Sequence, residues 1–234
     1  MNDPDLSGSR RQRARDLHVC YRRAGQIVRR LPFTLISLAV LSLAAVVTNS
    51  HIGDLSREWF NHLAFAPRDL SSVQWPRLIT SALVTRGGGA FWQVLGMVAV
   101  TTGVAEWLAG TRRSVLTFWG VHLATVLVES LVIALPLHTL GFSLGTALYL
   151  ARDVGPSAGS IGCLGLACAR LPRALQWAGG GLVLAGLATV FVLAVVTTQD
   201  ASVVSADLAH LLAFRLGWLS SLIGRRQCAL TEIR

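Results

Sequence analysis

The sequence is short of charged residues and contains no lysine. Only 14% of its 234 residues are charged, against about 25% in a typical soluble protein, whereas 53% are hydrophobic. This balance excludes a disordered chain and argues against an ordinary soluble domain, because long apolar stretches must be buried in protein or lipid. The 21 basic residues are all arginine and give a formal net charge of +9. Such a charge suits nucleic acid or an anionic membrane surface. The apolar excess favours the membrane, so no nucleic-acid partner is expected.

Cysteine is also scarce. Cys20, Cys163, Cys168 and Cys228 follow neither a metal-binding nor a disulfide spacing. Cys163 and Cys168 lie in an apolar run, where cysteine commonly packs as a small hydrophobic residue. We therefore expect neither a metal site nor a cofactor.

Apolar runs are what the sequence has in abundance. A hydrocarbon core of about 30 Å needs roughly 20 apolar residues in one helix. Windows of that length predict an all-α fold of six membrane-spanning helices, the fourth of them short: 32–49, 90–109, 114–135, 157–169, 174–197 and 204–223. The apolar but short stretch 138–150 is interpreted as a partly buried loop or an interfacial helix.

Clusters of arginine predict the orientation of these helices. They lie before the first span, after the second, after the fourth and after the sixth, which is one side of the membrane if there are six spans. Because cytoplasmic loops carry the excess of arginine, we expect a multi-pass protein of the cell membrane with both termini in the cytoplasm. The predicted organisation is a basic tail (1–31) that meets anionic lipids, a six-helix domain (32–223) and a short basic tail (224–234). A cleaved signal peptide in place of the first span is the alternative, which the long polar segment before it disfavours.

Ionisable residues inside the predicted spans mark candidate functional positions, because such groups are costly in lipid. Glu106 and Arg215 fall in the inner halves of the second and sixth spans and are candidates for an ion pair. His122 and Glu129 are seven residues apart and therefore share one face of the third helix. For these two we expect packing and hydrogen bonding within the bundle rather than catalysis.

The segment 153–165 combines a helix start with a run of small residues. Gly155 and Pro156 stand immediately before the predicted start, where proline is well tolerated. Gly162 and Gly165 give the helix small faces that let neighbouring helices approach closely. We therefore expect this short helix in the middle of the bundle.

Ser157 and His210 fall at one depth in the predicted bundle. At 1.5 Å per residue, Ser157 lies roughly 20 Å above Arg170, and His210 lies roughly 22 Å above Arg225. A serine and a histidine at one level can act as nucleophile and base, because a neutral imidazole takes the hydroxyl proton near pH 7. The backbone N–H groups of Ser157 and Ala158, at the positive end of their helix, are candidates to hold the resulting oxyanion.

Other interpretations of these residues stay open. Ser157 can simply be the N-cap of a glycine-packed helix. Ser160 is a rival nucleophile one helical turn deeper. Asp207 can orient the imidazole of His210 as a third member, or can sit in the headgroup region at a helix start, where acidic residues are favoured.

These residues together resemble the rhomboid family of intramembrane serine proteases. The likeness covers about residues 30–225 and is carried, in order, by Gln74-Trp75-Pro76-Arg77 with Thr80, by Glu106-x-x-x-Gly110, by Ser157 with Gly162 and Gly165, and by Asp207-Leu208-Ala209-His210 with Gly217. The resemblance implies a six-helix endopeptidase with a Ser157–His210 dyad that cleaves transmembrane segments of other membrane proteins. It also implies structural roles for Trp75, Arg77 and Glu106.

The sequence departs from the family's pattern at two places. The family has glycine directly after the nucleophile, where this chain has Ala158. The family's histidine and asparagine in the second span correspond to Ala90 and Val94, which have no side-chain donor. Losing one oxyanion donor typically costs roughly 10²–10³ in rate. The alternative function is therefore a proteolytically inactive rhomboid-like protein that binds transmembrane helices in membrane-protein quality control or assembly.

Overall fold

The computed structural model describes residues 25, 28–198 and 200–231, with side chains up to residue 222. The described part is all-α, as predicted, and its only β pairing consists of two isolated bridges, Asp54 with Gly87 and Phe65 with Asp153. The predicted N-terminal tail (1–31) lies almost entirely outside the described residues.

Every predicted span coincides with a helix. These helices are α2 (Pro32–Val47), α5 (Gly88–Ala109), α6 (Thr111–Val128), α9 (Ser157–Cys168), α10 (Arg173–Thr197) and α11 (Ala201–Thr231). By length and apolar composition, three helices of the described chain qualify to cross a membrane: α5, the continuous helix Thr111–Thr139, and α10. The helices α2 and α9 are apolar but shorter. α11 continues as a helix through Thr231, into the region predicted as a tail.

Shorter helices connect the long ones. Between α2 and α5 lie α3 (Arg57–Leu63), η1 (Pro67–Leu70), α4 (Arg77–Thr80) and η2 (Ser81–Leu83). After the long third helix comes α8 (Ser143–Leu150), so most of the stretch 138–150 is helix rather than loop.

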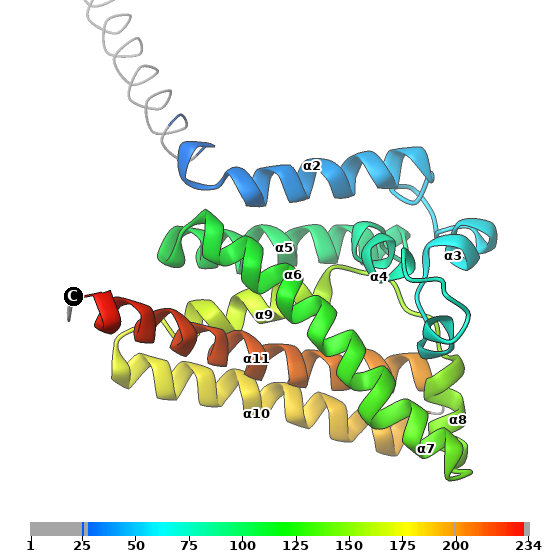
Figure 1. The fold of residues 1–234 in the computed structure, drawn as a ribbon. Coiled ribbons are helices and arrows are strands. Elements are labelled where there is room, and N and C mark those ends of the chain that lie inside the picture. The colour runs from blue at the N-terminus through cyan, green and yellow to red at the C-terminus, as the bar shows by residue number, and fades with distance from the viewer. Residues whose placement is uncertain (1–24, 26–27, 199, 232–234) are drawn as a thin grey trace, which may run out of the picture.

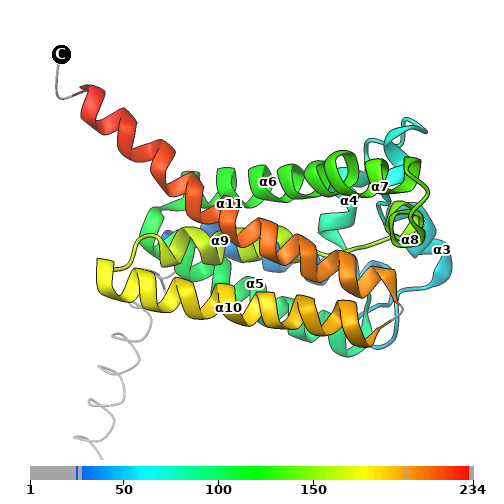
Figure 2. The same ribbon diagram turned by 90° about the horizontal axis from the view of Figure 1, so that it is seen from below.

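The short helix α9 lies at the centre of the bundle (Figures 1 and 2), in contact with α5, α6, α10 and α11. Ten of its 12 residues are buried. They form two apolar clusters with their neighbours, one including Ile161, Ala213 and Phe214 and the other including Phe118 and Leu166. The central position predicted for this helix is confirmed.

Glycines set how closely α9 and α11 approach. A Cβ atom built on Gly217 would overlap the backbone of Gly162, and one built on Gly165 would overlap the backbone of Phe214 and Trp218. The two helices run in the same direction, because α10 carries the chain back between them (Figure 1). These contacts therefore fix one parallel register for the pair.

The third long helix contains a wide turn. After α6, residues Glu129–Ala134 (η3) form a π-helical segment, which passes into α7 (Leu135–Thr139). Pro136 follows directly; it has no N–H to donate, and its ring clashes with the carbonyl one turn earlier. π-Turns of this kind occur frequently at functional sites, and this one carries the buried residues Glu129 and Ser130.

The connection between α2 and α5 is organised around Asp69, which is only 2% exposed. Its carboxylate accepts hydrogen bonds from the N–H of Ala66 at 3.0 Å and from Nη1 of Arg77 at 3.1 Å, and it pairs with Nη2 of Arg152 at 3.4 Å. Burial lowers the pKa of Arg152, and the charge of Asp69 opposes that shift. Because Arg152 lies just before α9, this cluster ties the connection to the start of the central helix.

Candidate functional site

The start of α9 is held by the connection between α2 and α5. Phe65 and Asp153 exchange two backbone hydrogen bonds, of 3.1 and 2.9 Å. The N–H of Gly155 donates to the carbonyl of Ser81 at 2.8 Å. Gly155 has a φ of +136°, a conformation that favours glycine. The turn before Ser157 is thus fixed by backbone contacts.

α9 begins at Ser157, after Pro156, as predicted from the sequence. Its first helical hydrogen bond is donated by the N–H of Ser160 to the carbonyl of Pro156, at 2.9 Å. The N–H groups of Ser157 and Ala158 precede that bond and have no acceptor within the helix. They are the two donors that were predicted from the sequence to hold an oxyanion.

Ser157 lines a small polar cavity of about 50 Å³ between α6, α9 and α11. A cavity needs only about 10–15 Å³ to hold one water molecule, so this one admits water. Its polar lining includes His122, Glu129, Ser130 and Ser205. These four side chains are all buried. The arrangement is a water-sized polar chamber inside an apolar bundle.

His122 and Glu129 face the interior of the bundle through hydrogen bonds, as expected. Glu129 accepts a hydrogen bond from the hydroxyl of Ser205 on α11. Nε2 of His122 lies 3.0 Å from the carbonyl oxygen of Leu78, which can only accept, so Nε2 carries the proton. Its Nδ1 is buried and has no partner among the described residues.

His122, which the sequence predicted to pack and hydrogen-bond within the bundle, also shares a cavity with Ser157. Its spacing of seven from Glu129 was the available signal, because it put both side chains on one inward face. The unpaired Nδ1 of His122 makes it a second candidate base beside Ser157.

His210 lies on α11 with a half-buried side chain. Its Nε2 atom is buried, and no hydrogen-bond partner for it is found in the described part of the chain. Nδ1 lies 3.9 Å from Oδ1 of Asp207, which is too long for a hydrogen bond. Asp207 therefore does not hold the imidazole in the way that a third catalytic member does.

The register of α9 and α11 relates His210 to Ser157. Gly165 contacts the backbone of both Phe214 and Trp218. Eight residues before these three stand Ser157, Ala206 and His210, so Ser157 is level with the turn of α11 from Ala206 to His210. The α11 residues that line the cavity beside Ser157 are Ser205 and Ala209. No hydrogen bond joins the Ser157 hydroxyl to His210 among the described residues.

Ser160 is fully buried, and its hydroxyl has no partner in the described part of the chain. The same contacts set it level with the turn Ala209–Ala213. Ser157, in contrast, is partly exposed and lines the cavity. Access to water therefore favours Ser157 as the nucleophile.

The expected ion pair between Glu106 and Arg215 is not formed. Glu106 is 1% exposed and accepts three hydrogen bonds from the start of α2: from the N–H of Phe33 at 2.9 Å, and from the N–H and the hydroxyl of Thr34 at 2.8 Å each. Arg215 is exposed on α11. The donors at the start of α2 thus satisfy the Glu106 carboxylate, for which the sequence had suggested Arg215 as the partner.

Four other residues were predicted to have structural or packing roles, and the structure places each of them. Gly162 and Gly165 pack against neighbouring helices as expected, with Val121 of α6 facing Gly162. Arg77 has a structural role through Asp69. Trp75 is 53% exposed and lines a shallow hollow rather than the core.

These features define an all-α protein with three helices suited to a membrane and a buried polar cavity at the start of its central helix. No protein-family model, no curated protein and no solved structure matches the chain. The resemblance to rhomboid proteases therefore rests on the residues themselves.

Proposed function

We propose that the protein is a rhomboid-like intramembrane serine endopeptidase that cleaves transmembrane segments of other membrane proteins. The observation that supports the proposal is the register of α9 and α11, in which Ser157 lies level with the turn of α11 that ends at His210. Ser157 also faces a cavity that admits water, the second substrate of hydrolysis. In this proposal the bundle crosses the membrane six times, with both termini in the cytoplasm.

In the proposed reaction, Nε2 of His210 takes the proton of the Ser157 hydroxyl as its oxygen attacks the peptide carbonyl. The N–H groups of Ser157 and Ala158 stabilise the oxyanion. The peptide C–N bond then breaks, and the leaving amine receives the proton from His210. A water molecule, deprotonated by His210, hydrolyses the acyl-serine and releases the second product. The buried, unpaired Nε2 supports this role, because such a group is costly unless function retains it.

The substrate has to expose a peptide carbonyl that a transmembrane helix keeps hydrogen-bonded. Local unwinding is therefore required, and helix-breaking glycine or proline near the cleaved bond is expected.

A second candidate is a proteolytically inactive protein that binds transmembrane helices in quality control or assembly. Two observations favour it. Ala90 and Val94 on α5 provide no side-chain donor for an oxyanion. The Ser157 hydroxyl and His210 are also not hydrogen-bonded to each other.

A fluorophosphonate probe distinguishes the two functions, because it reacts only with a serine hydroxyl activated by a base. We expect purified protein in liposomes to be labelled, and Ser157→Ala and His210→Ala to abolish labelling. Ser160→Ala is the matched control for the nucleophile and His122→Ala for the base; both should be labelled as the wild type is. Circular dichroism and thermal unfolding of each variant show whether a loss of labelling is merely a loss of fold.

Each other outcome changes the assignment. Loss of labelling in Ser160→Ala would make Ser160 the nucleophile. Loss of labelling in His122→Ala, with labelling kept in His210→Ala, would make His122 the base. If folded wild-type protein is never labelled, the helix-binding function is favoured.

A further inference from the structure

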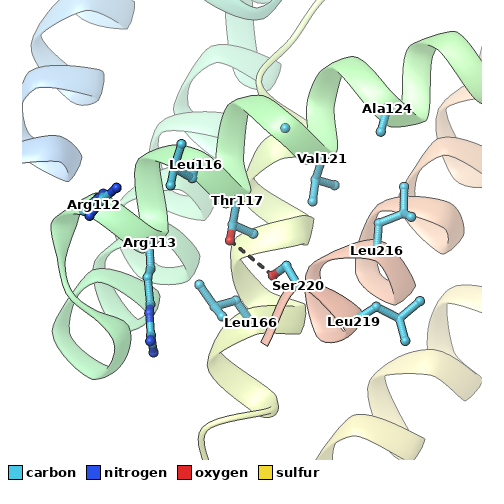
Figure 3. A pocket seen from close by; sticks show the side chains of 11 residues that line it. Arg112, Arg113, Leu116, Thr117, Val121, Ala124, Leu166, Leu216, Leu219 and Ser220 are labelled. Carbon is cyan, nitrogen blue, oxygen red and sulfur yellow. Dashed lines mark hydrogen bonds between the residues drawn. The ribbon is translucent and has the colours of Figure 1, made fainter. Parts of the chain in front are cut away.

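A long groove lies between α6 and α11, away from the polar cavity. Its volume is about 550 Å³, within the range of about 300–1,000 Å³ that is usual for small-ligand sites. Leu166 of the central helix lies beneath it (Figure 3). The walls come from two helices that the fold holds in contact.

The lining of this groove is suited to hydrocarbon. Leu116 of α6 is 63% exposed and Leu219 of α11 is 53% exposed. Both hydroxyls in the groove have partners: Thr117 bonds to Ser220 at 3.2 Å (Figure 3), and Ser220 donates to the carbonyl of Gly217 at 2.6 Å. An apolar chain lying there would therefore leave no hydroxyl unpaired.

One end of the groove is strongly basic. Arg112 and Arg113 line it there, at the first turn of α6, whereas Ala124 lies toward the other end (Figure 3). The described residues that line the groove include no acidic side chain, and neither arginine has an ion pair within the described chain. The two arginines are consecutive on α6, and a guanidinium group is well suited to a phosphate.

We propose that this groove binds one anionic phospholipid, with its phosphate on Arg112 and Arg113 and an acyl chain along the groove toward Ala124. Basic pockets between transmembrane helices commonly bind anionic headgroups. From Arg112 to Ala124 the helix rises about 18 Å, close to the roughly 15 Å of one leaflet's hydrocarbon. The site is separate from the proposed peptidase and does not depend on it.

The positive charge at the end of the groove favours a phospholipid over a transmembrane helix as the occupant. Gly120 and Ala124 form a small-residue step on α6 that would also suit a transmembrane helix. A helix, however, offers no phosphate to the two arginines at the end of the groove. A phospholipid satisfies both the apolar lining and the paired charge.

Native mass spectrometry of the protein in detergent, titrated with phosphatidylglycerol or phosphatidylcholine, tests the proposal. We expect one phosphatidylglycerol to bind preferentially. R112Q/R113Q should weaken its binding roughly 30-fold, because each of the two arginines usually contributes about 1 kcal/mol near an anionic surface. The matched control is R29Q/R173Q, which removes two exposed arginines, one three residues before α2 and one at the start of α10. This control should bind like the wild type, and equal weakening in both double variants would overturn the site.

Gly120→Leu tests the apolar part without touching the charge. A Cβ built on Gly120 meets no other atom within 4 Å, so the larger side chain fills the groove without a clash at the backbone. It should also lose the bound phosphatidylglycerol; unchanged binding would contradict the proposal. Displacement of the lipid by millimolar inorganic phosphate, or a dimer of the chain that disappears in Gly120→Leu, would equally overturn the lipid assignment.

Discussion

Gly217 of α11 lies directly against the backbone of Gly162 of α9, with no room for a Cβ atom between them. The contact occurs in the bundle's most buried helix, so it sets both the packing of the centre and the register that relates Ser157 to His210. A membrane bundle gains little from hydrophobic exclusion between helices, which makes such small-residue contacts its main source of close packing.

Gly217→Ala should therefore destabilise the protein. Overpacking of a close contact costs about 1–3 kcal/mol, and the melting temperature in detergent should fall. Gly186→Ala on α10 is the control, because its added methyl group meets nothing within 4 Å. It should be neutral or slightly stabilising, since alanine is the better helix former. Equal melting temperatures for the two variants would contradict the tight contact.

Glu106 should be needed to hold α2 on the bundle. Glu106→Ala removes the acceptor of three hydrogen bonds and leaves buried donors unpaired, at about 1–3 kcal/mol for each unsatisfied group. We expect a lower melting temperature and faster proteolysis around α2. Arg215→Ala, by contrast, should leave both unchanged, because Arg215 is exposed. If Arg215→Ala matched Glu106→Ala, the two residues would be partners after all.

Asp69→Asn should loosen the connection between α2 and α5. Removing one partner of a buried ion pair costs about 3–5 kcal/mol, because the other charge stays buried. Limited proteolysis should then cut within 64–80, which should resist in the wild type. Arg86→Gln is the control: its ion pair with Asp153, at 3.2 Å, is largely exposed and should contribute little. Cleavage of both variants at the same rate would argue against a special role for Asp69.

Asp200 should add a small pH-dependent term at the start of α11. Hydrogen bonds from the hydroxyl and the N–H of Ser202 lower the pKa of its carboxyl below the usual value. A lowered pKa stabilises the folded state fully above the usual value, and the gain is lost as the pH falls through the lowered one. Asp200→Ala should thus melt slightly below the wild type at pH 7, and the gap should close in acid, once the pH falls below the lowered pKa. A gap that does not change with pH would exclude this role.

The sequence located the helices well because their apolar runs are long and uninterrupted. All six predicted runs became helices, and the small residues of 157–168 correctly indicated a central helix. Length and composition qualify three helices as spans, so the count of six stays a prediction. The π-turn at Glu129–Ala134 was not anticipated, since it reflects the competition between Pro136 and the helical hydrogen bonds.

The arrangement of the site was harder to predict from the sequence than the fold was. Depth along single helices suggested the shared level of Ser157 and His210, and the glycine contacts set Ser157 level with the turn of α11 that ends at His210. Partners across helices depend on rotation as well as depth, which one sequence does not specify. For that reason the acceptor role of Glu106 toward α2, and the cavity that joins His122 to Ser157, became visible only in three dimensions.

The most direct test of the proposed dyad is an experimental structure of the protein after reaction with a phosphonofluoridate. We expect phosphorus bonded to the Ser157 oxygen, a phosphonyl oxygen facing the N–H groups of Ser157 and Ala158, and Nε2 of His210 within hydrogen-bond distance of the adduct. An adduct on Ser160, or a His210 side chain turned away from an unmodified Ser157, would contradict the account.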